Sequence, residues 1–235
     1  MELQSIQHHA AMLMYLAFTV SCYYFSKWLH SRFPVFIFIP LVFVPVVIVI
    51  LVLSLHIPYQ DYMWDSHWLV WMLGPATLAF AVPVYEYRTL IVKHWLSLTT
   101  GVFIAVSAGV GSTLLLSRWF HLSEMLQRSL AMRSITTPFA MVATESIGGK
   151  PDLTAVFVVI TGVIGIVVGE LVLGGLTITS HHGKGAGLGA CAHGAGTATA
   201  YKIDNQAGVI ASLMMMLSGV VTVLLAPWLG HILWA

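Results

Sequence analysis

One histidine stands inside a run of small residues with an unusually free backbone. Residues 183–201 hold six glycines, and His193 is followed by Gly194, Gly196 and Thr197. An imidazole titrates near physiological pH, so His193 could donate to a carboxylate or carry protons. The glycines would let the main chain approach a ligand closely. The simpler alternative is that the ring only bonds a backbone carbonyl.

A second candidate site begins at Ser134. Thr136, Thr137 and Pro138 follow, and hydroxyl residues ahead of a proline predict a helix start with Thr137 as N-cap. The unpaired N–H groups and the positive end of such a helix attract carboxylate or phosphate. The alternative is an ordinary capped helix without a ligand.

Glu145 lies in or at the edge of the apolar stretch after Pro138, where an ionisable group suggests function. Desolvation raises a carboxyl pKa toward neutrality, so Glu145 and His193 are the candidates for proton coupling. Alternatively, Glu145 pairs with the nearby Lys150.

The other reactive side chains do not form a recognisable centre. His181, His182, Cys191 and His193 fit no standard zinc spacing, and no carboxylate completes such a set. The chain also lacks a nucleophile elbow and a phosphate loop. We therefore expect no metal, no cofactor and no enzymatic activity.

The composition of the chain indicates that these residues lie in a membrane protein. Of 235 residues, 58% are hydrophobic and only 8% are charged, and the mean hydropathy is +0.89. Soluble proteins carry about 25% charged residues, so this chain is a multi-pass membrane protein surrounded by lipid. The net charge of +1 and the absence of a basic run give no support for nucleic-acid binding.

The fold expected is an all-α polytopic membrane protein with about 7–8 transmembrane or re-entrant segments. Long apolar stretches predict membrane spans at 10–26, 34–57, 95–117, 153–175 and 207–233. Three shorter apolar stretches are marginal by length, at 68–85, 134–147 and 186–200. Irregular backbone at membrane depth survives only where protein buries it or where it lines a wet cavity. Broken helices therefore predict a binding site.

The whole chain, 1–235, is expected to form a single integral membrane domain. Residues 1–60 would supply N-terminal spans, while 68–118 and 134–233 would form a repeat-built transporter core. A weak echo supports the repeat, because Leu73-Gly74 and Leu188-Gly189 each precede a short stretch and then a long span. Lys27 and Arg32 place the first loop inside the cell by the positive-inside rule. The linker 118–133 is interpreted as an amphipathic surface helix.

Taken together, the motifs resemble the LrgB/CidB family, and their order and spacing agree over most of the chain. The resemblance rests on Ser134 to Pro138, on Ser146-Ile147-Gly148-Gly149, on Leu73-Gly74-Pro75-Ala76-Thr77 and on His193-Gly194-Ala195-Gly196-Thr197-Ala198. Family members carry an arginine two residues after the Gly-Thr pair. Thr199 stands there in this chain, and Lys202 could replace the lost charge.

This resemblance implies a bacterial inner-membrane protein that works beside a small LrgA/CidA-like membrane partner as a homo- or hetero-oligomer. It implies transport of small monocarboxylates such as pyruvate or glycolate. The alternative that it implies is a holin-like or antiholin-like modulator of murein hydrolase export and cell lysis. The expected substrate site lies between the helix start and the glycine segment, and comprises Ser134, Thr136, Thr137, Pro138, His193, Gly194, Gly196 and Thr197.

Overall fold

The computed structural model describes residues 2–79, 81–176, 178 and 180–234. These residues form helices joined by short turns, and no strand occurs among them. Two compact units share the chain, Met1–Pro75 and Ala76–Ala235. The expected all-α membrane architecture is confirmed.

The first unit packs its long first helix against the two that follow. It contains α1 (Glu2–Arg32), the 3-10 turn η1 (Phe36–Phe38), α2 (Pro40–Ser54) and α3 (Tyr59–Trp71). The hydroxyls of Thr19 and Tyr62 lie 2.9 Å apart, and the fully buried Ser26 hydroxyl donates to the Phe38 carbonyl at 2.9 Å. These two hydrogen bonds join α1 to α3 and to η1.

Within the described residues, four helical stretches are long and apolar enough to cross a membrane. They are Ser66–Glu86, Trp95–Trp119, Pro151–Gly175 and Asn205–Trp234, and Pro40–Ser54 is a shorter apolar helix. The last three match the spans expected from residue 95 onward. Most other helices are too short to span about 30 Å of hydrocarbon at about 1.5 Å per residue.

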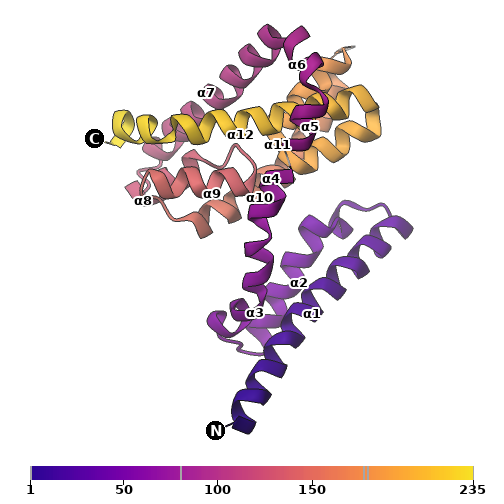
Figure 1. The fold of residues 1–235 in the computed structure, drawn as a ribbon, viewed down its shortest axis with the longest axis vertical. Coiled ribbons are helices and arrows are strands. Elements are labelled where there is room, and N and C mark those ends of the chain that lie inside the picture. The colour runs from indigo at the N-terminus through magenta and orange to yellow at the C-terminus, as the bar shows by residue number, and fades with distance from the viewer. Residues whose placement is uncertain (1, 80, 177, 179, 235) are drawn as a thin grey trace. The chain divides into compact units, whose positions relative to one another are not determined.

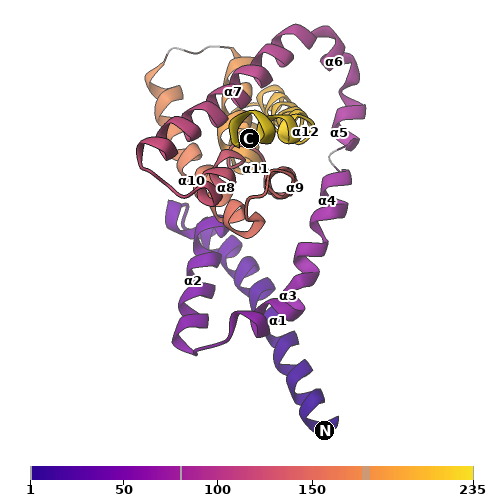
Figure 2. The ribbon, with the colours of Figure 1, turned by 90° about the vertical axis from the view of Figure 1, so that its left-hand side faces the viewer.

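The second unit is built around its C-terminal helix. It contains the end of α4 (Leu73–Ala79), then α5 (Ala81–Glu86), α6 (Arg88–Lys93), α7 (Trp95–Trp119), α8 (Glu124–Ala131), α9 (Thr137–Ser146), α10 (Pro151–Gly175), α11 (His181–Ile203) and α12 (Asn205–Trp234). Figures 1 and 2 show α12 running beside α7, α9 and α11. Leu213, Met214 and Met216 on α12 are almost wholly buried, so this helix forms the core of the unit.

The helix α11 is a hairpin of two short arms. At His193 the backbone leaves helical geometry, with φ 51° and ψ −131°, which are values typical of the first central residue of a type II′ turn. The side chains of His181 and Asp204 meet at the two ends, with Nδ1 3.5 Å from Oδ2. A straight helix of 23 residues would separate those ends by about 35 Å. The arms 181–192 and 194–203 therefore run in opposite directions, and His193 forms the tip.

Glycines allow the arms of the α11 hairpin to pack against backbone. A Cβ at Gly196 would clash with the Leu188 carbonyl of the opposite arm, and a Cβ at Gly189 would clash with the Ala211 carbonyl on α12. Ser180 accepts a hydrogen bond from the Gly183 N–H at 3.3 Å and caps the first arm. The glycine content read from the sequence thus reflects close helix packing as well as the break.

The helices α8 and α9 form a second hairpin, whose tip is residues 132–136. At its base the Arg128 guanidinium donates to the Ile147 carbonyl at 2.8 Å, and the Lys150 N–H donates to the Ser129 hydroxyl at 2.9 Å. The fully buried hydroxyls of Thr144 and Thr154 lie 2.9 Å apart and join α9 to α10. The amphipathic helix expected over 118–133 is shorter than that segment, because Arg118 and Trp119 end α7 and the helix α8 covers Glu124–Ala131. Its Ser129 and Ala131 are buried, and its Glu124 and Met125 are exposed.

The two hairpins enter from opposite ends of the helix bundle. The C-terminal ends of α7 and α12 lie together, since Arg118 donates to the Leu233 carbonyl at 3.2 Å, and Gly230 on α12 lies against Ile147 at the base of the α8–α9 hairpin. The base of the α11 hairpin lies instead at the starting end of α12, where Gly185 approaches Ala207. A long helix followed by a hairpin thus occurs twice, first as α7 with α8–α9 and then as α10 with α11. The two hairpins enter the bundle in opposite directions.

Candidate functional site

The tips of the two hairpins meet. Arg133 and Ser134 of the first tip line one cavity together with Ala190 and Cys191, which lie just before the second tip. The Ser134 main chain and the Arg133 charge lie close enough to the His193 imidazole to act on it. His193 is only 5% exposed, and its Nε2 atom has no hydrogen-bond partner among the described residues. We call Arg133, Ser134 and His193 the tip cluster.

The α8–α9 tip is also held against α7. A Cβ at Gly109 would lie 2.6 Å from the Ser134 hydroxyl oxygen, so only glycine leaves room for Ser134 at this point. Gly109 is near the middle of α7, and the tip cluster therefore lies far from both ends of the bundle. The helix α9, which runs from this tip to the base of the hairpin, has ten residues and rises only about 15 Å, which is about half of the hydrocarbon thickness.

Arg133 connects two long helices across the tip cluster. Its Nε donates to the Thr113 hydroxyl on α7 at 3.1 Å, and its Nη1 donates to the Thr161 hydroxyl on α10 at 3.3 Å. Thr113 in turn donates to the Gly109 carbonyl at 2.7 Å. Two hydroxyls thus fix the plane of the guanidinium, and its remaining N–H groups bond no other described residue.

Two cavities share the residues around Arg133. The first, of about 290 Å³, lies on the α7 side and is lined mainly by small residues such as Ala105, Ala108 and Ser112. The second, of about 370 Å³, lies on the α10 side and is lined by larger apolar residues such as Phe157, Ile160 and Ile164. Both cavities are lined by Arg133, Thr161 and Cys191.

The residues predicted around Ser134 lie at the tip of the α8–α9 hairpin. Ser134 lies near the His193 ring and lines the first cavity. The helix α9 begins at Thr137, with Thr136 as N-cap and Pro138 in the first turn, so the helix starts one residue earlier than expected. Thr136 makes no side-chain capping bond. The first turn of α9, which has no side-chain cap from Thr136, begins three residues after Ser134.

The residues predicted around His193 begin the second arm of the α11 hairpin. Gly194 directly follows the turn, Gly196 is buried against the first arm, and the Thr197 hydroxyl lies 4.0 Å from the Met215 sulfur on α12. The structure thus brings His193 and Ser134 together, although 58 positions of sequence separate them. Thr197 faces α12.

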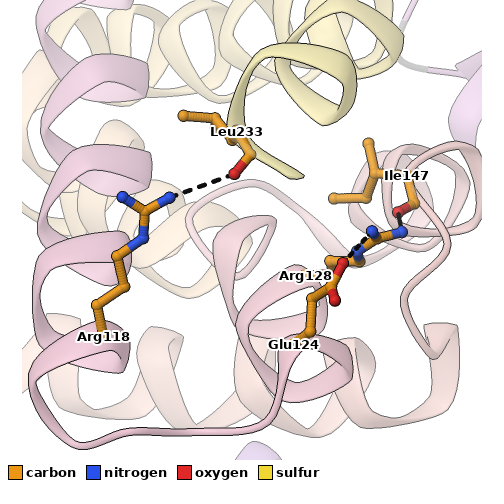
Figure 3. A network of polar contacts seen from close by, with 5 residues as sticks. All are labelled: Arg118, Glu124, Arg128, Ile147 and Leu233. Atoms are coloured by element: carbon orange, nitrogen blue, oxygen red, sulfur yellow. Dashed lines mark hydrogen bonds and ion pairs between the residues drawn. The ribbon is translucent and has the colours of Figure 1, made fainter. Parts of the chain in front are cut away.

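Glu145 lies away from the tip cluster. It is the penultimate residue of α9, at the base of the hairpin, and its side chain is exposed. No ion pair to Lys150 occurs among the described residues, where the pairs are Arg128 with Glu124 and His181 with Asp204. A polar network lies at this base of the α8–α9 hairpin (Figure 3). In it Arg128 binds Glu124 and the Ile147 carbonyl, and Arg118 donates to the Leu233 carbonyl nearby.

Sequence reasoning missed Arg133, Thr113 and Thr161. Arg133 was counted with the charges of the linker 118–133, because Arg118, Glu124 and Arg128 precede it. One signal was available. Arg133 is the last charge before an uncharged stretch of eleven residues that contains the Ser134 to Pro138 motif. His181, His182 and Cys191 do not form a metal-binding group within the described part of the chain.

Comparison with known proteins places the chain in a family. A sequence model of the LrgB-like family matches residues 19–232. YwbG of Bacillus subtilis strain 168 is 38% identical over 214 residues, which cover 91% of this chain and 95% of YwbG. The antiholin-like protein LrgB of the same strain is 31% identical over 169 residues, or 72% and 73% of the two chains.

A further relative is the holin-like protein CidB of Staphylococcus aureus strain Mu50. It is 29% identical over 215 residues, which cover 92% of this chain and 94% of CidB. No solved structure shows significant similarity to this chain. The family match over most of the chain and the helical architecture agree with the resemblance seen in the motifs, and the protein belongs to the LrgB-like family of membrane proteins.

Proposed function

We propose that this protein transports small monocarboxylates, such as pyruvate or glycolate, across the bacterial inner membrane. The observation that carries the proposal is the meeting of two half-length hairpins, from opposite ends of the bundle, at His193 and Ser134. Broken helices that meet near mid-depth are typical of transporter substrate sites. A lipid-facing pore has no need of such an element.

The polarity of the tips supports an anionic substrate. The helix α9 and the second arm of α11 both begin at the tip cluster, at Thr137 and Gly194. Helix starts carry partial positive charge and unpaired N–H groups, which favour carboxylates. The neighbouring Arg133 adds a full positive charge.

The size of the cavities supports a small substrate. Volumes of about 290 and 370 Å³ are at the lower end for ligand pockets, so they suit an acid of a few carbons better than a large metabolite. His193 is the candidate for proton coupling at the tips, and Glu145 is the candidate at the base of the α8–α9 hairpin.

The proposal includes a small LrgA/CidA-like partner in the same membrane. The names of the relatives, holin-like for CidB and antiholin-like for LrgB, support an assembly that acts on the membrane barrier. Many large apolar side chains of the second unit are exposed, among them Phe103, Leu115 and Leu224. Lipid, a second copy or the partner would cover them.

Proteoliposomes test the proposal. The purified protein, with and without the partner, should take up radiolabelled pyruvate or glycolate, and unlabelled monocarboxylate should compete. Lack of uptake by correctly inserted protein in both preparations would contradict it.

The second candidate function is a holin-like or antiholin-like regulator of murein hydrolase release. The printed names of CidB and LrgB favour it. Release of an encapsulated dye too large for the cavities separates the two functions. A regulator that forms pores should release the dye, whereas a transporter should carry the acid and retain the dye.

A further inference from the structure

We infer that Arg133 binds the carboxylate of the substrate. This inference rests on the proposed function, which it deepens by naming the residue that binds the carboxylate. Its basis is the geometry of Arg133, the charge balance around it and the lining of the two cavities.

The guanidinium of Arg133 is preorganised. Thr113 and Thr161 accept from Nε and Nη1, at 3.1 and 3.3 Å, and these two hydroxyls belong to different long helices. Because the guanidinium is planar with five N–H donors, fixing two of them orients the rest. A carboxylate that approached Nη2 would therefore meet a donor already held in place.

The charge of Arg133 has no carboxylate partner among the described residues. The ion pairs there involve Arg128 with Glu124 and His181 with Asp204. Thr161 lies near the middle of α10, so the guanidinium is far from both ends of this span. A charge at membrane depth is costly unless it is balanced, and ionisable groups there mark substrate pathways. One monoanion would neutralise Arg133, whereas a dianion would leave an unbalanced negative charge.

The cavities indicate what the rest of the ligand is. Arg133 and Thr161 are polar residues of both cavities, and Ser112 and Ser134 add two hydroxyls to the first one. Ala105 and Ala108 border these polar residues on one side, and Phe157 and Ile160 border them on the other. A carboxylate on Arg133 would therefore place its carbons against apolar side chains. This arrangement suits a short monocarboxylate and disfavours a sugar or a second charged group.

Cys191 provides a direct probe of occupancy. It is exposed and lines both cavities, and the other cysteine, Cys22, is buried in the first unit. In full-length Cys22→Ser protein in membranes, a small maleimide should label Cys191. Sodium pyruvate should slow the labelling, while the neutral pyruvamide and the dianion malonate should protect far less.

Arg133→Gln tests the residue, and Lys202→Gln is the matched control. Lys202 is an exposed cation at the end of the second arm of α11, and the sequence alone suggested it as a carboxylate-binding charge in place of an arginine at position 199. A hydrogen bond to a charged group contributes about 1.5–3 kcal/mol, so Arg133→Gln should weaken pyruvate protection by at least about tenfold. Arg133→Lys should keep part of it, and Lys202→Gln should keep all of it.

The two readouts separate this inference from the proposed function. Unchanged labelling of Arg133→Gln without pyruvate shows that the hairpins remain folded. Pyruvate protection that persists in Arg133→Gln, or that is lost in Lys202→Gln, overturns the inference. A third outcome is that pyruvate protects Cys191 in the wild-type protein but not in Arg133→Gln, while the wild-type protein takes up no pyruvate. That outcome supports the binding site and contradicts the transport function.

Discussion

His181 and Asp204 close the base of the α11 hairpin, with Nδ1 of the imidazole 3.5 Å from Oδ2 of the carboxylate. Both residues therefore lie at the same end of the helix bundle, although an entire helix-length segment separates them. This relationship makes α11 a hairpin with His193 at its tip, and it predicts that α11 enters and leaves the membrane on the same side. The topology of the second unit follows from it.

Cysteine labelling tests this topology. In a Cys22→Ser, Cys191→Ser background, Ser180→Cys and Asn205→Cys should react with an impermeant maleimide from the same side of the membrane. Glu124→Cys and Ser146→Cys, at the base of the α8–α9 hairpin, should both react from the opposite side. Labelling of positions 180 and 205 from opposite sides would show that α11 crosses the membrane.

Packing of the α11 hairpin on α12 depends on Gly189. Gly189→Ala places a Cβ against the Ala211 carbonyl, so we expect a loss of about 1–3 kcal/mol of stability. Gly187→Ala is the matched control, because Gly187 has open space and alanine favours a helix by about 0.5–1 kcal/mol. Thermal unfolding in detergent measures both. Equal melting temperatures for the two variants would be incompatible with this packing.

The turn at His193 carries backbone strain. A non-glycine residue with φ 51° and ψ −131° costs about 1–3 kcal/mol, and glycine removes most of that cost. His193→Gly should therefore be more stable than His193→Ala by about 1 kcal/mol, since both lack the imidazole but only alanine keeps a Cβ. Denaturation of the two proteins under identical conditions gives the difference. A more stable alanine variant would argue against the turn.

The buried hydroxyls of Thr144 and Thr154 join α9 to α10. Thr154 donates to the Ser129 carbonyl at 2.9 Å, so Thr144 donates to Thr154. Thr154→Val leaves buried groups without partners and should cost about 1–3 kcal/mol, and the double valine variant should cost less than the sum of the single ones.

Thr222→Val is the control for this pair. Among the described residues the buried Thr222 hydroxyl bonds only the Ser218 carbonyl of its own helix, at 2.7 Å, so the loss of stability should be smaller for Thr222→Val. Additive effects of the Thr144 and Thr154 substitutions, measured by unfolding of the four proteins of the cycle, would refute the coupling.

Sequence patterns could predict the two tips but not how they meet. Threonine and proline marked the start of α9, and the density of glycine marked the break in α11, because both signals are local. The reversal at His193 depends on contacts such as Gly196 with Leu188 and His181 with Asp204, which no local pattern reveals. The charge density around Arg133 indicated a surface helix. The hydroxyls of Thr113 and Thr161, distant in sequence, are what hold that arginine inside the bundle.

Counterflow of pyruvate tests the central claim most directly. Proteoliposomes loaded with unlabelled pyruvate are diluted into a trace of labelled pyruvate, and internal label is followed over time. A transporter with a site at the hairpin tips predicts a transient accumulation of label above equilibrium, which Thr137 and His193 substitutions should abolish and Gly187→Ala should preserve. Monotonic equilibration of label without accumulation, as through an open pore, would contradict the account.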